Sequence, residues 1–110
     1  MKKRHLLLAM LVSVFTMGVA QAWPDKPVTL VVPFPPGGAT DLIARTLAPK
    51  LQEKLGGSFI TDNKAGATGT IGAGFVTRAP ADGHTLLVSS LGPYVIAPHL
   101  LSKVPYDALK

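Results

Sequence analysis

The chain has 110 residues, no cysteine and a formal net charge of +5. Residues 1–22 carry three of the eleven basic residues and none of the six acidic ones, so the remainder has eight basic and six acidic residues and a charge of +2. Without a basic stripe or many aromatic residues for base stacking, we expect no nucleic-acid partner, and the lack of cysteine excludes disulfides and thiol nucleophiles.

The first 22 residues have the pattern of an export signal. Residues 2–5 are basic, residues 6–19 form an apolar run, and Ala20-Gln21-Ala22 has the small-x-small pattern of a cleavage site. The apolar run of 14 residues is shorter than the roughly 20 that span a bilayer. We therefore expect a signal peptide over residues 1–22, cleavage before Trp23, and no membrane insertion afterwards.

Two elements are predicted in the first half of the remaining chain. Residues 28–32 are mostly apolar and β-branched and are followed by Pro33, which predicts a buried strand. Residues 39–55 predict a helix, because apolar side chains recur every four residues and two glycines follow. Pro49 is expected to kink this helix or to mark a second start.

The second half predicts a strand over residues 58–61, a helix over residues 70–79 and a third strand over residues 85–89. Gly72 and Gly74 would let the helix pack closely on a sheet. A proline-interrupted loop with one helical turn near residues 96–101 is expected to follow. This order of elements predicts an α/β fold with a parallel sheet built from two right-handed βαβ units.

The loop after the first strand, residues 33–41, is a candidate binding site. Strand-to-helix loops of a parallel sheet open on one edge, where ligands usually bind. Gly37 and Gly38 expose backbone there, and the unpaired N–H groups at the helix start, Ala39 and Thr40, suit an anion. A tight turn without a ligand, with the helix capped from within, is the alternative.

Asp41 in the same loop has two possible roles. A carboxylate near a helix N-terminus stabilises the helix but would repel an anion in contact with it. It could bind the ammonium group of an amino-acid ligand, and otherwise it caps the helix.

The loop after the second strand has a similar composition and would face the same edge. Ala67, Thr68 and Gly69 lie in it, and Lys64 before them is either a charged contact or a solvated surface lysine. Ser89 and Ser90 end the third strand, where they add hydroxyl donors or form a plain strand exit. Two donor-rich loops at one edge favour ligand binding.

Known catalytic patterns are missing from the sequence. Gly38 is not followed by the Lys-Ser/Thr of a phosphate loop, the glycines at 66, 69, 72 and 74 have the wrong order for a dinucleotide fingerprint, and no Gly-x-Ser-x-Gly elbow is present. His84 and His99 have no nearby ligand pair, so no metal site is expected. Donors without an acid–base pair predict binding without turnover: no enzyme and no cofactor. An enzyme of phosphate-containing substrates is a competing hypothesis.

Several motifs resemble one family in order and spacing: WPDKPVTLVVPFPPGGATDLIAR, DNKAGATGTIGAGFV, APADGHTLLVSS and KVPYDALK. The chain resembles the Bug-type substrate-binding receptors of tripartite tricarboxylate transporters. The resemblance implies a periplasmic protein of two α/β lobes that close around a small carboxylated solute and pass it to integral-membrane transporter subunits. It also implies ligand contact by residues 34–41, which include Phe34, and by residues 65–70, with Ser89 and Ser90 at the same cleft.

Members of that family are roughly three times as long as this chain. We therefore expect residues 23–110 to form a partial N-terminal lobe of a solute-binding protein, as a fragment or a degenerate copy. The alternative is a truncated, non-binding α/β interaction module that pairs through its open sheet edge.

Overall fold

The computed structural model describes residues 20–109, and the basic and apolar parts of the predicted signal peptide lie outside them. In chain order the elements are β1 (Val28–Val32), α2 (Ala39–Leu55), β2 (Phe59–Asn63), the short 3-10 helix η1 (Ala67–Gly69), α3 (Thr70–Arg78), β3 (Thr85–Leu87), the π-helical η2 (Gly92–Ile96) and α4 (Ala97–Leu100). Strands and helices therefore alternate, as the sequence predicts.

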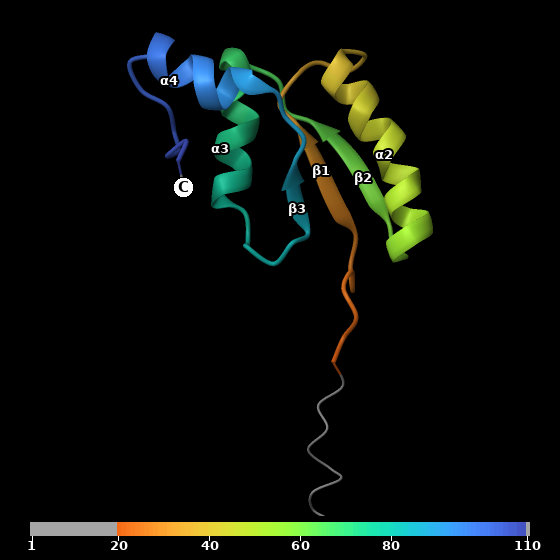
Figure 1. The fold of residues 1–110 in the computed structure, drawn as a ribbon. Coiled ribbons are helices and arrows are strands. Elements are labelled where there is room, and N and C mark those ends of the chain that lie inside the picture. The colour runs from red at the N-terminus through yellow and green to blue at the C-terminus, as the bar shows by residue number, and fades with distance from the viewer. Residues whose placement is uncertain (1–19, 110) are drawn as a thin grey trace, which may run out of the picture.

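The three strands form one parallel sheet in the order β2-β1-β3 (Figure 1). β1 pairs with β2 over its whole length and with β3 over residues 29–31. Both edges of β1 are paired, helices contact it, and every side chain except that of Thr29 is buried. This position explains the nearly uninterrupted apolar sequence of β1. The structure confirms the α/β class with a parallel sheet.

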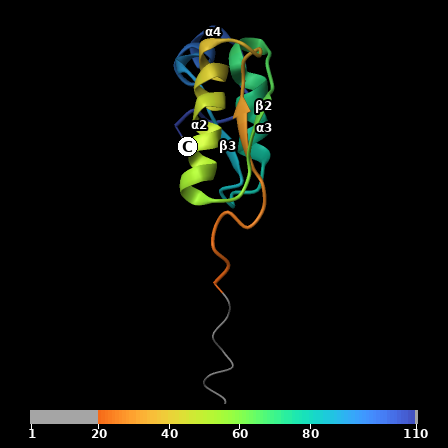
Figure 2. The same ribbon diagram turned by 90° about the vertical axis from the view of Figure 1, so that its right-hand side faces the viewer.

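The helices α2 and α3 cover opposite faces of the sheet (Figures 1 and 2). Val28 and Leu30 point to the same face of β1, where they pack with Ala48 of α2 and Phe59 of β2 in the main core. Helix α3 contacts β1 and β3, and its Ala73 is fully buried. Within residues 20–109, no helix is long and apolar enough to cross a membrane.

The predicted bounds agree with the structure for β1 and α2. Helix α2 continues through Pro49, so it has no second start. β2 begins at Phe59 and extends to Asn63, two residues beyond the prediction, because its last residues still pair with β1. β3 ends at Leu87, two residues earlier than predicted.

The segment after β3 is more helical than the sequence indicates. A proline-interrupted loop with one helical turn near residues 96–101 was expected. α4, at residues 97–100, confirms the helical turn, but η2 makes residues 92–96 helical where a loop was expected. Pro93 lies in the first turn of η2, where an N–H group has no helical acceptor and its loss costs little. Pro98 lies in α4, which continues η2 without a break. The prediction of a loop is therefore wrong at residues 92–96, because Pro93 acts as a helix start.

The glycines of α3 have different neighbours. A Cβ on Gly72 would lie 2.6 Å from the Cβ of Pro33 and 2.9 Å from the carbonyl oxygen of Lys64, so α3 touches the exits of β1 and β2. This confirms the close packing expected at Gly72. A Cβ on Gly74 would instead meet Pro105, at 2.8 Å, so this glycine faces the segment after α4 and not the sheet.

We expect Gly72→Ala to lower the free energy of unfolding by about 1–3 kcal/mol, because the new methyl group would overlap backbone atoms that cannot move independently. Gly74→Ala is the matched control: both variants gain about 1 kcal/mol of helix propensity, but the methyl group at position 74 meets side-chain atoms and no backbone atoms, namely the Pro105 ring at 2.8 Å and the Arg78 guanidinium at 3.2 Å. Urea unfolding followed by circular dichroism measures both. Equal stability of the two variants would contradict close packing at Gly72.

Candidate functional site

The carboxyl ends of the three strands and the start of α2 lie at one edge of the sheet, at the upper end of the view in Figure 1. Phe34, just after β1, is close to both other strand exits. A Cβ on Gly69 would lie 3.3 Å from the tip of the Phe34 ring, and one on Gly92 would lie 3.8 Å from it. The loops after β1, β2 and β3 therefore converge at this edge, as predicted.

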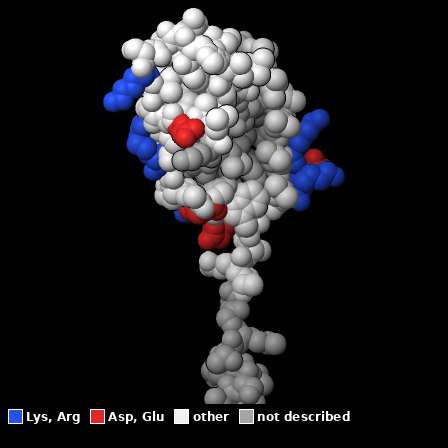
Figure 3. Space-filling view, turned by 60° about the vertical axis from the view of Figure 1, so that its left-hand side comes forward, with Lys and Arg blue, Asp and Glu red and all other residues white. Residues whose placement is uncertain are grey.

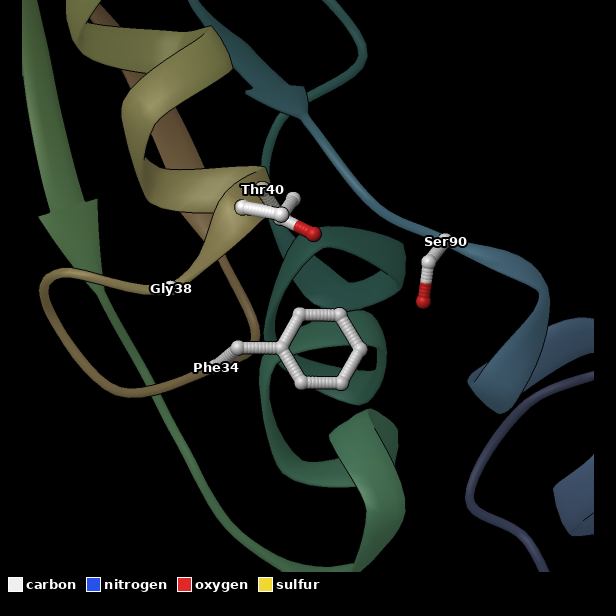
Figure 4. Close-up of a pocket in the computed structure, with 5 residues that line it drawn as sticks. Phe34, Gly38, Thr40 and Ser90 are labelled. Atoms are coloured by element: carbon white, nitrogen blue, oxygen red, sulfur yellow. The ribbon is translucent and has the colours of Figure 1, made fainter.

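A hollow of about 390 Å³ opens beside Phe34. It is lined by Phe34, Gly38, Ala39, Thr40 and Ser90. In Figure 4 the hydroxyl group of Thr40 is directed toward Ser90, and the ring of Phe34 lies close to both. The hollow thus combines one aromatic surface, two hydroxyl groups and the first turn of α2.

The first turn of α2 supplies backbone donors to this hollow. Gly38 is the N-cap residue, with extended backbone (φ −75°, ψ 169°), and no side chain caps the helix. The first intrahelical bond runs from the N–H of Leu42 to the carbonyl of Gly38, at 3.0 Å. The N–H groups of Ala39 and Thr40 precede it, so they have no acceptor within the helix. They carry the positive end of the helix dipole, which favours an anion.

Two of the expected backbone donors are occupied within the protein. The N–H of Gly37 donates to Oδ2 of Asp41 at 2.8 Å, and the N–H of Gly69 donates to the carbonyl of Gly66 at 3.0 Å. The N–H groups of Gly37 and Gly69 are therefore not available to a ligand. At the hollow, the available backbone donors are those at the start of α2. Gly37 has φ +88°, which only glycine adopts readily, so its part is to turn the loop.

The other predicted residues lie around the hollow without lining it. Ala67 and Thr68 are exposed, with left-handed backbone (φ 45° and 58°), and the carbonyl of Thr68 lies near Gly92. Ser89 is half-buried, and its hydroxyl donates to the carbonyl of Ser90 at 3.4 Å. The loop after β2 therefore adjoins the site on the side of the Phe34 ring.

Asp41 is the most constrained residue of the loop, with a side chain only 2% exposed. Its Oδ2 accepts from the Gly37 N–H and from Nε of Arg45, at 2.9 Å, and its Oδ1 accepts from Nδ2 of Asn63, also at 2.9 Å. The carboxylate thus binds groups of the protein itself. It does not cap the helix, as the alternative expected, but accepts from the N–H of Gly37, one residue before the N-cap.

Arg45 and Asn63 were not predicted as parts of the site. The sequence places Arg45 within the helix predicted over residues 39–55 and Asn63 in the loop after the strand predicted over residues 58–61. The available signal was positional: Asn63 ends a strand at the edge where ligands bind, and Arg45 follows Asp41 by one helical turn.

The partners of Asp41 keep its carboxylate charged. The hydrogen bond from Arg45, then those from the Gly37 amide and the Asn63 side chain, lower the pKa of Asp41 to about 2. Arg45 balances this charge locally, at an N–O distance of 2.9 Å. An incoming anion therefore meets an ion pair and not an isolated negative charge.

No lysine or arginine lines the hollow. Lys64 pairs with Asp62 at 3.1 Å and lies 4.3 Å from the centre of the Phe75 ring, which supports the surface-lysine alternative. On the face shown in Figure 3, basic side chains lie on the two flanks, acidic side chains lie near mid-height and at the lower end, and the uppermost surface carries no charged side chain. Among residues 20–109, no group of three acidic, His or Cys side chains could hold a metal ion.

Because the pKa of Asp41 is lower in the folded chain than its ordinary value near 3.9, its contribution to stability is complete above about pH 4 and is lost as the pH falls toward 2. We expect the urea midpoint of the unmodified chain to fall over this range. Asp41→Asn should be less stable at pH 7 and should show a shallower fall. If the urea midpoints of the two proteins fell equally between about pH 4 and pH 2, the hydrogen bonds of Asp41 would not stabilise the fold as described.

The chain is similar in sequence to one family of receptors. Residues 43–110 match the family described as tripartite tricarboxylate transporter family receptor. Protein BugT of Bordetella pertussis is 39% identical over 100% of this chain and 36% of its own length. A UPF0065 protein encoded in the tcbD-tcbE intergenic region of Pseudomonas sp. (strain P51) is 47% identical over 79% of this chain and 26% of its own length. The chain thus spans about a quarter to a third of these relatives.

Solved structures show the same fold. MatC from Rhodopseudomonas palustris, with bound malate, matches with a TM-score of 0.74 and 41% identity over 78% of this chain and 29% of its own. A second R. palustris protein, with adipate, matches with a TM-score of 0.76 and 41% identity over 79% of this chain and 29% of its own. The periplasmic binding protein BugD matches with a TM-score of 0.57 and 48% identity over 59% of this chain and 22% of its own, which places the sheet within the α/β fold of periplasmic binding proteins.

The family match covers more than half of the chain, and it agrees with the resemblance of the motifs and with the expectation of a protein that is not an enzyme. The chain belongs to the tripartite tricarboxylate transporter receptor family.

Proposed function

We propose that this chain is a periplasmic solute-binding receptor, or the N-terminal part of one, that captures a small carboxylate for a tripartite tricarboxylate-type transporter. Residues 1–22 would be the signal peptide that directs export, and residues 23–110 a part of the N-terminal α/β lobe. Integral-membrane transporter subunits would receive the solute. Family membership supports the receptor role, and the basic and apolar pattern of residues 1–22 supports the signal peptide.

The observation that carries the proposal is the donor set of the hollow. Unpaired amides of Ala39 and Thr40 lie beside the hydroxyl groups of Thr40 and Ser90. A carboxylate has two oxygens that accept several hydrogen bonds, and such donors match it without a fixed positive charge. Two related structures were solved with malate and with adipate, and both are dicarboxylates.

The ring of Phe34 supplies the apolar part of the site. It forms a wall of the hollow and is half-buried against the loops after β2 and β3. A ligand with a carbon chain between its carboxylates would place methylene groups on this ring while one carboxylate meets the start of α2. Malate and adipate are therefore suitable first probes.

The hollow also argues against turnover. None of its five lining residues is His, Lys, Cys or an acidic residue. The nearest carboxylate, that of Asp41, holds the loop and is kept charged by its partners. The site therefore has no group that could serve as an acid, a base or a strong nucleophile.

Gly38→Val is expected to weaken malate and adipate binding about 10- to 100-fold, because the branched side chain would cover the first-turn amides and remove one or two hydrogen bonds to a charged group. The backbone at Gly38 is extended, and a Cβ there would lie 3.6 Å from the carbonyl of Pro35, so the fold should be retained. Isothermal titration calorimetry measures the affinity, and circular dichroism the helix content.

Gln52→Val is the matched control, since position 52 is exposed in the last turns of the same helix, away from the hollow. It should bind as the unmodified chain does. Retained affinity in Gly38→Val would contradict direct contact with the amides, and absence of binding by the unmodified chain to a panel of carboxylates would contradict the proposed function.

A further inference from the structure

Asn63 contacts both ends of the loop that connects β1 to the first turn of α2. Its Nδ2 donates to the carbonyl of Phe34 at 3.1 Å and to Oδ1 of Asp41 at 2.9 Å, while its Oδ1 accepts from Nη2 of Arg45 at 3.1 Å. The opposite orientation of the side-chain amide would set its oxygen against two acceptors. One neutral side chain therefore joins the exit of β1 to the first two turns of α2.

We propose that Asn63 is a positioning residue of the solute site, which holds the loop of residues 34–38 and the first turn of α2 in the geometry that receives a carboxylate. The inference rests on the proposed function. Asn63 does not line the hollow, so it acts through Phe34 and Asp41.

The sheet gives Asn63 a rigid base. It is the last residue of β2 and lies opposite Val32 of β1, and the next residue, Lys64, donates its N–H to the carbonyl of Val32 at 2.8 Å. A side chain fixed by a strand can hold a loop more precisely than one that the loop itself carries. The position of the loop is thus fixed by a side chain that is anchored to β1, the central strand of the sheet.

The two bonds from Nδ2 act on both sides of the turn. The bond to Phe34 fixes the backbone from which the ring enters the hollow. The bond to Asp41 completes the hydrogen bonding of the carboxylate that holds the Gly37 amide. With both ends held, the intervening residues are ordered before a ligand arrives. The free energy of binding is then not reduced by the entropy lost on ordering them.

Asn63→Asp tests this role because it keeps the shape and removes the donor. An ionised Asp at this position would set an oxygen where Nδ2 now lies, against Asp41 and the Phe34 carbonyl, and the pair of carboxylates would take up a proton at a higher pH than either alone. A protonated side chain could again donate to Asp41. The affinity of the variant should therefore depend on pH in a way that the unmodified chain's affinity does not.

The measurement is calorimetry with malate and with adipate at pH 8 and pH 5, with each variant compared with the unmodified chain at the same pH. At pH 8 we expect Asn63→Asp to bind about tenfold more weakly, from the loss of a hydrogen bond to a charged group, and at pH 5 the ratio should return toward one. Asn63→Ala should bind weakly at both pH values. Gln52→Glu adds the same charge at an exposed position of α2 and should have no effect.

A second readout needs no ligand. Hydrogen exchange of the Gly37 amide, followed by NMR, should be faster in both Asn63 variants at pH 8 and should slow again in Asn63→Asp at lower pH, relative to the unmodified chain under the same conditions. A helix content equal to that of the unmodified chain would show that the change is local.

The outcomes separate the two proposals. Binding by the unmodified chain with an unchanged affinity ratio in Asn63→Asp at both pH values would overturn the role of Asn63 and leave the proposed function intact. If the unmodified chain binds neither probe, the exchange of the Gly37 amide decides: pH-dependent loosening supports the positioning role, and unchanged exchange overturns it. Global loss of helix in both variants would also overturn it, since Asn63 would then serve the whole fold.

Discussion

A buried carboxylate with donors from three places in the chain is the constraint on which the site depends. Asp41 accepts hydrogen bonds from the turn at Gly37, from Arg45 one turn along α2 and from Asn63 at the end of β2. Removing any one of these donors would leave a buried, charged oxygen less well satisfied, which is costly. These bonds hold the three segments together at the edge of the sheet. They do not use the N–H groups in the first turn of α2, which stay without an acceptor in the described part of the protein.

The same arrangement resolves an electrostatic conflict. Under the proposed function, a lone carboxylate close to the hollow would oppose the binding of an anion, whereas one paired with Arg45 contributes little net field. The attraction is left to dipoles: the start of α2 and the hydroxyl groups of Thr40 and Ser90. Such neutral donors need no desolvation of an ammonium or guanidinium group, and they release their ligand more easily than a buried ion pair would. Reversible capture is what a transport receptor requires.

Sequence patterns predict the fold better than they predict the site. The β-branched run of β1 and the four-residue periodicity of α2 depend only on neighbours in the chain, and their bounds agree with the structure. The convergence of the loops followed from the parallel sheet. The Asp41–Arg45 pair could be derived from its spacing of one helical turn, but the contact of Asp41 with Asn63 could not, because it requires β2 to lie beside β1 and strand order is set by packing. Pro93 misled for a related reason: only its place in the first turn of η2 makes a proline compatible with that helix.

The residues that shape the hollow and the residues that anchor its loop are different. The ring of Phe34 lines the hollow, and only its backbone carbonyl takes part in the network, where it accepts from Asn63. Thr40 and Ser90 take no part in the hydrogen bonds of Asp41. Side chains at these three positions can thus be exchanged to accommodate a longer, shorter or more polar solute without dismantling the support beneath them. Because these two sets of residues are separate, the fold is a practical starting point for biosensors, in which the residues that line the hollow are redesigned and those that hold the loop are kept.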